Sequence, residues 1–324
     1  MYSYFVMRSS SAFKSRWRTV LQEAARFLVL ALLGILGVFL LTSYWAPARA
    51  LALAVLKRTD GCTFGQSIAA AREYMLRNTG ISRTAAASHL MRSEPPSLEL
   101  WETPQGRFWI QSRTYMTAFY RLLVEDELNH YGAGEMGPRD GDVVLDCGAA
   151  QGTFVRKALR AGARLVVAIE PLPSNVACLE RTFADEIAQG RVIVCPRGVW
   201  DKEDKLVLRI VPDDPYDSSL VRQGSSVPGV VVPLTTIDLL VTELKLSAVD
   251  YIKMDIEGSE KNALMGAAQT VKKHRPRLAI SVDHVPEDPV RVPEIVRQLE
   301  PGYREQCRCN DFGNEIRRAV VNFY

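Results

Sequence analysis

The sequence predicts an α/β fold: a Rossmann-like, mostly parallel sheet with helices on both faces and an antiparallel hairpin at its C-terminal edge. Three observations support this fold class. From about residue 138 onward, short apolar runs alternate with segments of helical spacing, as in a parallel sheet with crossover helices. The last two strand-like segments, residues 303–310 and 317–324, can close the sheet as an antiparallel pair. A long uncharged run near the N-terminus adds a helical membrane anchor in front of the sheet.

The anchor is the run at residues 27–46, which has about the length that crosses ~30 Å of hydrocarbon. Tyr44 and Trp45 at its end suit the interface between membrane and water. Two alternatives remain open, a signal peptide cleaved after Ala50 and a buried core helix. We expect an anchor, because the run is longer than a signal-peptide core and lacks the polar face of a core helix.

The charges around the anchor do not fix its orientation. Residues 1–26 form a polar, basic tail, and the segment after the anchor is basic as well, so the positive-inside rule does not decide. A single-pass helix and a shallow monotopic helix bent near Pro47 are both compatible with the sequence. The basic residues concerned are Lys14, Arg16, Arg18 and Arg26 before the run and Arg49, Lys57 and Arg58 after it.

Composition excludes some classes of protein. The 324 residues are 47% apolar and 24% charged, which is ordinary for a globular protein with a substantial core. A net charge of +3, without a basic run interleaved with aromatic residues, argues against a nucleic-acid partner.

The cysteines predict a reducing environment. They lack the paired spacing of a zinc site, and Cys307 and Cys309 are too close in sequence for an ordinary disulfide. Cys147 and Cys195 lie in apolar, strand-like runs. We therefore expect mostly reduced, buried thiols, which fits a catalytic domain on the cytoplasmic side of the membrane.

Between the anchor and the alternating region, residues 47–95 form a predicted helical linker that is rich in Ala, Leu and Arg. The breaker "SEPPS" at residues 93–97 marks a boundary, so the large domain is expected at residues 96–324. It opens with a short strand, "GRFWIQS", and a helix that ends at Gly132.

The alternating region then gives its elements in order. The expected strands are "DVVLDCG", "RLVVAIEP", "RVIVCPRGVW", "VDYIKMDIEG" and "RLAISVDH". Helices are expected at "TFVRKALRAG", at "SNVACLERTFADEIAQG" and from Ser259 to about Val271. An inserted hairpin, "KLVLRIV" with "VVVPLTTIDLL", interrupts the series. Ligands of such sheets collect at the carboxyl ends of the strands.

Two strand ends predict a nucleoside-containing cofactor. Asp146, Gly148 and Gly152 lie at a strand-to-helix turn that is close to, but differs from, the dinucleotide pattern GxGxxG. Glu170 ends the next strand, about twenty residues on, where a carboxylate accepts hydrogen bonds from ribose hydroxyls. Taken alone, the turn also fits a tight loop without a ligand.

The segments "DCGAAQGTF", "AIEPLPSNVACLERTF", "GVWD", "TTIDLL" and "IKMDIEGSE", in this order, resemble the FkbM family of S-adenosylmethionine-dependent methyltransferases over about residues 100–324. The resemblance implies the seven-stranded methyltransferase sheet, S-adenosyl-L-methionine as the cofactor and methyl transfer, usually to a hydroxyl oxygen. It implies cofactor contacts for Asp146, Gly148, Gly152 and Glu170, and an adenine contact for Asp201.

The sequence departs from that family in two places. The family loop usually reads GAN, whereas Ala150 and Gln151 stand here, so we expect Gln151 to supply the polar contact to the methionine end. The tail of the family often carries a His pair, and here Cys307, Arg308 and Cys309 occupy its place.

The end of the fourth strand predicts the catalytic groups. Asp255 and Glu257 alternate and are expected to point together into the cleft. Asp255 is expected to orient or deprotonate an acceptor hydroxyl, and His284 is a candidate general base because its ordinary pKa suits proton transfer at neutral pH. Asp238 and Asp283 are possible partners of His284.

The predicted function is therefore an S-adenosylmethionine-dependent methyltransferase of the membrane, acting on a hydroxyl of a sugar, a glycolipid or another small metabolite. A nicotinamide-dependent oxidoreductase and an inactive scaffold with a methyltransferase fold remain alternatives. No ligand spacing demands a metal, although an ion between Asp255 and Asp283 stays open. The polar loop at residues 212–229 is expected to contribute to the pocket wall; its Ser218 and Ser219 either touch a polar acceptor or, as we favour, form a plain turn.

Overall fold

The computed structural model describes residues 11–94, 98–111, 116–209 and 229–324. Its centre is an eight-stranded sheet. Counted from the edge strand β7 (Val192–Cys195), the first five neighbouring strands are parallel, as predicted. The strands that follow β7 are β6 (Leu165–Ile169), β5 (Val143–Cys147), β11 (Tyr251–Met254) and β12 (Arg277–Ser281).

The C-terminal edge of the sheet is antiparallel, which confirms the predicted closing pair. β14 (Ile316–Phe323) pairs with β12, and β13 (Glu305–Asp311) pairs with β14. The sheet gains one strand that the sequence did not indicate, because the short β1 (Thr59–Asp60) adds to β14 in parallel. The resulting order places β5, β6 and β11 side by side in the middle of the sheet.

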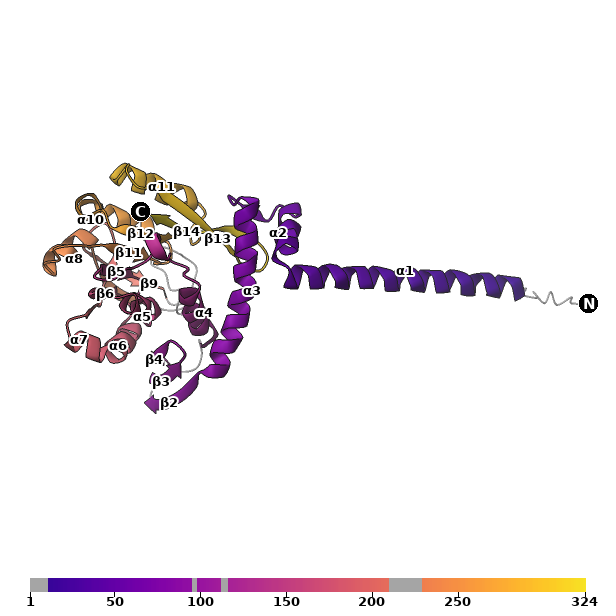
Figure 1. Ribbon diagram of the computed structural model, residues 1–324, viewed down its shortest axis with the longest axis horizontal. Coiled ribbons are helices and arrows are strands. Elements are labelled where there is room, and N and C mark those ends of the chain that lie inside the picture. The colour runs from indigo at the N-terminus through magenta and orange to yellow at the C-terminus, as the bar shows by residue number, and fades with distance from the viewer. Residues whose placement is uncertain (1–10, 95–97, 112–115, 210–228) are drawn as a thin grey trace, which may run out of the picture.

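Helices cover both faces of this sheet (Figure 1). Alternate residues of the strands separate the two cores: Leu145, Val167 and Ile252 face one group of helices, while Val144 and Val166 face the other. Both cores are fully buried, so the central strands read as nearly continuous apolar runs. The first group of helices is α8 (Ile237–Glu243), α9 (Glu260–Met265), α10 (Ala268–His274) and α11 (Asp288–Leu299). The second includes α5 (Thr153–Arg160), α6 (Pro173–Thr182) and the neighbouring α7 (Ala184–Ala188).

Two small sheets flank the central one. The predicted inserted hairpin is formed by β9 (Asp204–Leu208) and β10 (Val230–Thr235), and β8 (Gly198–Val199) pairs with β10. Ser218, Ser219 and nearly all of the loop at residues 212–229 lie outside the described residues.

The second small sheet differs from the prediction. β2 (His89–Glu94) is a strand where a helix was expected, and it pairs antiparallel with β3 (Leu98–Thr103), which pairs with β4 (Gly106–Gln111). Ser93 and Glu94 of "SEPPS" belong to β2, and residues 95–97 lie outside the described residues. Strand pairing at residues 89–92 outweighs the helical pattern expected there.

The N-terminal region is helical. α1 (Ser11–Tyr44) projects away from the rest of the chain (Figure 1), and its segment Val20–Tyr44 is long and apolar enough to cross a membrane or to act as a signal sequence. After it come α2 (Ala46–Val55) and α3 (Phe64–Ala87), followed later by α4 (Met116–Glu127) and the short η1 (Gly134–Met136). The side chains of Val20–Tyr44 contact almost nothing else in the chain.

One disulfide corrects the cysteine prediction. Cys62, just before α3, is bonded to Cys309 in β13, across 247 residues of sequence. An ion pair between Arg49 in α2 and Asp311 also links the N-terminal region to β13. Sequence spacing cannot reveal a partner so far away, because only the fold brings the two thiols together. The prediction of free thiols holds for the remaining cysteines, Cys147, Cys178, Cys195 and Cys307.

Candidate active site

A cleft opens at the carboxyl ends of β5, β6 and β11, the place that a parallel sheet offers to a ligand. Its empty volume is about 1060 Å³, which includes the part open to solvent. Gly148 and Glu170 line one end, and Asp255 and Glu257 line the other. The cofactor and acceptor ends expected from the sequence thus belong to one hollow.

The turn after β5 requires a glycine. Gly148 has a φ of +81°, and a Cβ atom there would stand 2.0 Å from the carbonyl oxygen of Asp255. The turn is pinned at its start by the Asp255 amide, which donates to the carbonyl oxygen of Cys147 at 3.1 Å. The close approach brings the ends of β5 and β11 together, so Gly148 couples the two ends of the cleft.

Glu170 at the tip of β6 is held by backbone amides. Its Oε2 accepts a hydrogen bond from the amide of Ala150 at 2.8 Å, and its Oε1 accepts one from Leu172 at 2.9 Å. Burial raises the pKa of Glu170 to about 7, although these amides and the side chain of Asn175 favour the ionised form. The carboxylate is rigid and keeps lone pairs for hydroxyl donors in the cleft.

Asp146 and Gly152 lie behind the turn and outside the lining of the cleft. Asp146 is fully buried and lies outside the lining of the cleft, with its Oδ1 3.1 Å from Nζ of Lys253. Gly152, with a φ of +86°, lets the ring of Phe183 pack against the backbone, because a Cβ atom would stand 2.3 Å from that ring. Both residues support the turn from behind.

Gln151 and Asp201 also lie outside the cleft lining. Gln151 is buried, whereas Asp201 is exposed and accepts a hydrogen bond from the side chain of Asn262 at 3.1 Å. The wall that the family resemblance assigned to Asp201 is instead formed by Arg197, Gly198 and Val199. The structure thus gives no support to a cofactor contact from either side chain.

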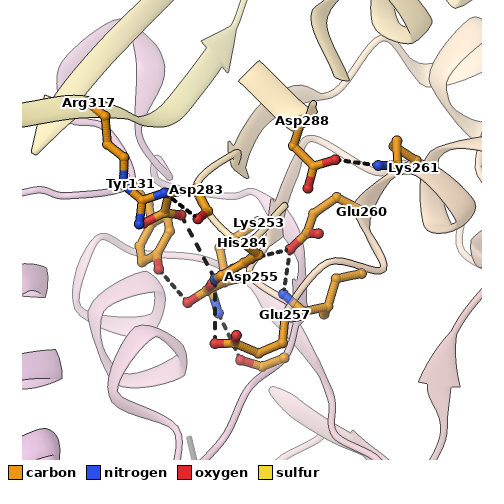
Figure 2. A network of polar contacts seen from close by, with 12 residues as sticks. Tyr131, Lys253, Asp255, Glu257, Glu260, Lys261, Asp283, His284, Asp288 and Arg317 are labelled. Carbon is orange, nitrogen blue, oxygen red and sulfur yellow. Dashed lines mark hydrogen bonds and ion pairs between the residues drawn. The ribbon is translucent and has the colours of Figure 1, made fainter. Parts of the chain in front are cut away.

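The other end of the cleft is a cluster of carboxylates around one imidazole (Figure 2). Nε2 of His284 lies 3.3 Å from Asp255 Oδ1 and 3.4 Å from Glu257 Oε1, and its Nδ1 lies 3.0 Å from Glu260 Oε1. The expected convergence of Asp255, Glu257 and His284 is therefore present. Its cause is different from strand alternation, because β11 ends at Met254 and Glu257 has a left-handed φ of +56°.

The charges of this cluster raise the pKa of His284. Burial alone would lower the pKa of His284, but Glu260, Asp255 and Asp283 raise it to about 9. For Asp255 burial acts in the opposite direction and would raise the pKa. This pKa is nevertheless held well below its usual range by Lys253, by His284 and by hydrogen bonds from Tyr131 and Ser281. At neutral pH these charges favour an imidazolium beside an ionised carboxylate, and the role of His284 as a general base stays a prediction.

Two expected neighbours differ in position. Asp283 lies at the edge of the cluster, with its Oδ1 3.9 Å from Nε2 of His284. Asp238 lies elsewhere, where its carboxylate accepts hydrogen bonds from the amides of Gln269 and Thr270 at the start of α10. A partnership of Asp238 with His284 is therefore excluded.

Sequence reasoning missed Tyr131 and left Lys253 without a definite role. The Tyr131 hydroxyl donates to Asp255 Oδ2 at 2.6 Å, and burial raises its pKa well above the ordinary value. Lys253 lines the cleft, and its ammonium donates to the carbonyl oxygen of Gly148 at 2.8 Å. The only signal for Tyr131 was a polar aromatic residue before Gly132, at the end of a helix. Lys253 also pairs with the carboxylate of Asp146.

Solved structures show distant similarity. A methyltransferase FkbM from Methylobacillus flagellatus KT is 21% identical, with a TM-score of 0.47, and the alignment covers 78% of this chain and 59% of that one. TYW2 of M. jannaschii, solved in complex with AdoMet, is 14% identical, with a TM-score of 0.38 and coverage of 72% and 88%. This chain thus spans 59% of the length of the M. flagellatus protein. Neither similarity is close enough to transfer an activity.

Comparison with protein families is more specific. No curated protein matches the chain. The profile described as "Methyltransferase FkbM domain" matches residues 146–308, which is half of the 324 residues. The match begins at Asp146, passes through the cleft residues of β6 and β11, and includes His284. The chain therefore belongs to the FkbM methyltransferase family.

Proposed function

We propose that this methyltransferase uses S-adenosyl-L-methionine and methylates a hydroxyl group of a sugar, a glycolipid or another small metabolite, as an enzyme of the EC 2.1.1 class. The observation that carries the proposal is the single cleft with Glu170 at one end and Asp255 and Glu257 at the other. A nucleoside end and an acid end in one hollow are what methyl transfer to a hydroxyl requires.

The Glu170 end supports the choice of cofactor. Its carboxylate faces the cleft and is fixed by the amides of Ala150 and Leu172, so it presents acceptor lone pairs to the two ribose hydroxyls. Val199 and Leu208 line the same cleft and offer apolar surface to a base. The cofactor supplies an electrophilic methyl group, and these residues bind and orient it.

The Asp255 end supports a hydroxyl acceptor. As the new C–O bond forms and the C–S bond breaks, the hydroxyl loses its proton, and a cleft carboxylate, Asp255 or Glu257, receives it. His284 is positively charged at neutral pH in the empty site, so it orients and stabilises the carboxylates. Tyr131 fixes the other oxygen of Asp255 through its 2.6 Å hydrogen bond.

The two earlier alternatives now stand differently. Membership of a methyltransferase family argues against the hypothesis of a nicotinamide-dependent oxidoreductase. Whether the protein is an enzyme or an inactive scaffold is tested by two experiments. Full-length protein in detergent is titrated with S-adenosylhomocysteine by calorimetry. It is then incubated with labelled S-adenosylmethionine and lipid or glycan extracts. We expect saturable binding and transfer of label to an extract. Absence of binding at millimolar ligand to folded protein contradicts the proposal.

We also propose that the protein is attached to a membrane, with its catalytic domain on the side opposite to the one expected from the sequence. The apolar segment Val20–Tyr44 favours attachment to a bilayer, by a single pass or as a monotopic helix. The disulfide between Cys62 and Cys309 favours an oxidising compartment for the catalytic domain, opposite to the cytoplasmic side expected from the sequence. Alkylation of intact cells with a bulky maleimide, before and after reduction, tests this: reduction should expose two additional thiols per chain.

A further inference from the structure

The acid end of the cleft has the spacing of a metal site. Nε2 of His284, Oδ1 of Asp255 and Oε1 of Glu257 lie within 4.8 Å of one another, and the two distances from Nε2 are 3.3 and 3.4 Å. Ligand atoms held ~2.1 Å from one ion stand about 3.0 to 3.4 Å apart in octahedral or tetrahedral geometry. The two distances from Nε2 are thus those that a shared ion produces.

A proton explains this spacing less well. Nε2 can carry one hydrogen, yet it faces two carboxylate oxygens at 3.3 and 3.4 Å. A charge-assisted N–H···O bond is about 2.7–2.9 Å long, so neither contact is a good hydrogen bond. The contact on the opposite side of the ring, from Nδ1 to Glu260, is shorter, at 3.0 Å.

Glu260 orients the imidazole as the carboxylate behind a metal-binding histidine does. It is fully buried, and its Oε1 also accepts the amide of Ile256 at 2.9 Å, so it stays in place as the acceptor for Nδ1–H of His284. This arrangement directs the Nε2 lone pair toward Asp255 and Glu257. The buried Oε2 of Glu260 has no hydrogen-bond partner among the described residues, an independent sign of uncompensated negative charge beside the ring.

The two nearest lysines each contact a carboxylate outside the cluster, although the charge of Lys253 also lowers the pKa of Asp255. Four carboxylates (Asp255, Glu257, Glu260 and Asp283) lie within 4 Å of the one imidazole. The ammonium of Lys253 contacts Asp146 at 3.1 Å. The ammonium of Lys261 contacts Asp288 at 2.6 Å (Figure 2). An added cation between Asp255 and Glu257 would balance the cluster.

We propose that Asp255, Glu257 and His284 bind a divalent transition-metal ion, such as Mn²⁺, at the acceptor end of the cleft. One imidazole with two carboxylates suits such an ion better than Ca²⁺, which prefers oxygen ligands alone. The role of the ion rests on the proposed function: it holds the acceptor oxygen and favours its deprotonated form. With the ion bound, Asp255 and Glu257 would be its ligands, so the hydroxyl proton would pass to bulk water instead of to either carboxylate as the C–O bond forms and the C–S bond breaks.

The test uses Mn²⁺ itself. Full-length protein in detergent is stripped with a chelator and titrated with Mn²⁺, and the free ion is measured by electron paramagnetic resonance. We expect one saturable site per chain, weakened about 10–100-fold by Glu257→Gln and about 10-fold by Glu260→Gln, which removes the support of His284. Asp283→Asn is the matched control, because Asp283 lies in the same cluster but is no ligand, and its affinity should stay close to that of the parent protein.

Two results overturn the proposal. One is the lack of a saturable Mn²⁺ site in protein whose cooperative thermal unfolding shows that it is folded. The other is an equal loss of affinity in Asp283→Asn and Glu257→Gln, which indicates a diffuse acidic patch. S-adenosylhomocysteine is titrated into the same samples without metal: binding of it in the absence of an Mn²⁺ site defeats the metal proposal alone, whereas an Mn²⁺ site without such binding defeats the proposed cofactor alone.

Discussion

The two ends of the cleft are built in different ways. At the nucleoside end, one carboxylate, Glu170, is fixed by backbone amides of Ala150 and Leu172. At the acid end, Asp255 and His284 are fixed by other side chains, chiefly Tyr131 and Glu260. The first end keeps a carboxylate with a raised pKa, and the second keeps one with a lowered pKa.

The difference shows how one sheet edge separates two tasks. Hydrogen bonds from backbone amides and from Asn175 compensate Glu170 more than the charge of Lys253 does, and burial still dominates its pKa. Lys253 and His284 compensate Asp255 with charge, so it stays ionised. A carboxylate that is rigid and weakly acidic suits binding of hydroxyls, whereas an ionised one suits an acceptor proton or a metal ion.

The largest expected effect comes from Gly148, where the two ends touch. In Gly148→Ala the new Cβ would stand 2.0 Å from the carbonyl oxygen of Asp255, at a φ of +81°. We expect a loss of about 4 kcal/mol or more in the free energy of unfolding, together with loss of cofactor binding. Urea unfolding of the full-length protein and calorimetry with S-adenosylhomocysteine measure the two effects.

A matched glycine separates steric conflict from backbone strain. Gly134 also has a positive φ, of +58°, but nothing lies within 4 Å of its Cβ position. Gly134→Ala should therefore cost only about 1 kcal/mol and leave cofactor affinity unchanged. Equal losses in the two variants would show that the close contact between β5 and β11 does not hold the ends of the cleft together.

The next effect concerns Glu170. Glu170→Gln places an amide group where two backbone N–H groups need acceptors, so one donor loses its partner and the ribose hydroxyls lose a charged acceptor. We expect cofactor affinity to fall about 10–100-fold, as measured by calorimetry. A change smaller than twofold would remove Glu170 from the cofactor site.

The pH dependence of the free energy of unfolding should show the ionisation of Glu170. The native pKa of Glu170 is about 7, against an ordinary value of 4.5, so the native state holds a proton that the unfolded chain has already released. This contribution is complete below pH 4.5 and is lost as the pH rises to about 7, by at most about 3 kcal/mol. Stability curves of the parent protein and of Glu170→Gln should therefore converge at low pH and diverge as the pH rises, and parallel curves would contradict this assignment.

The sequence predicted which residues meet at the acid end, but it did not predict the contacts that fix them, for a physical reason. Glu170 follows its strand at a spacing that the parallel fold imposes, and the alternation of strands and helices is itself local in sequence. The acid end depends on Tyr131 and Glu260, whose contacts span 124 and 24 residues. Cys62 is a more extreme case, because its partner lies 247 residues away.

The smallest expected effect concerns Asp201, near the nucleoside end of the cleft. Asp201 was assigned an adenine contact by resemblance, but its exposed carboxylate accepts a hydrogen bond from Asn262 at 3.1 Å, outside the cleft lining. Asp201→Asn should therefore leave affinity for S-adenosylhomocysteine within about twofold of the parent value, since an exposed hydrogen bond contributes little. A tenfold loss by calorimetry would mean that Asp201 turns into the cleft when the cofactor binds. The nucleoside end would then also depend on a side chain, and its contrast with the acid end would disappear.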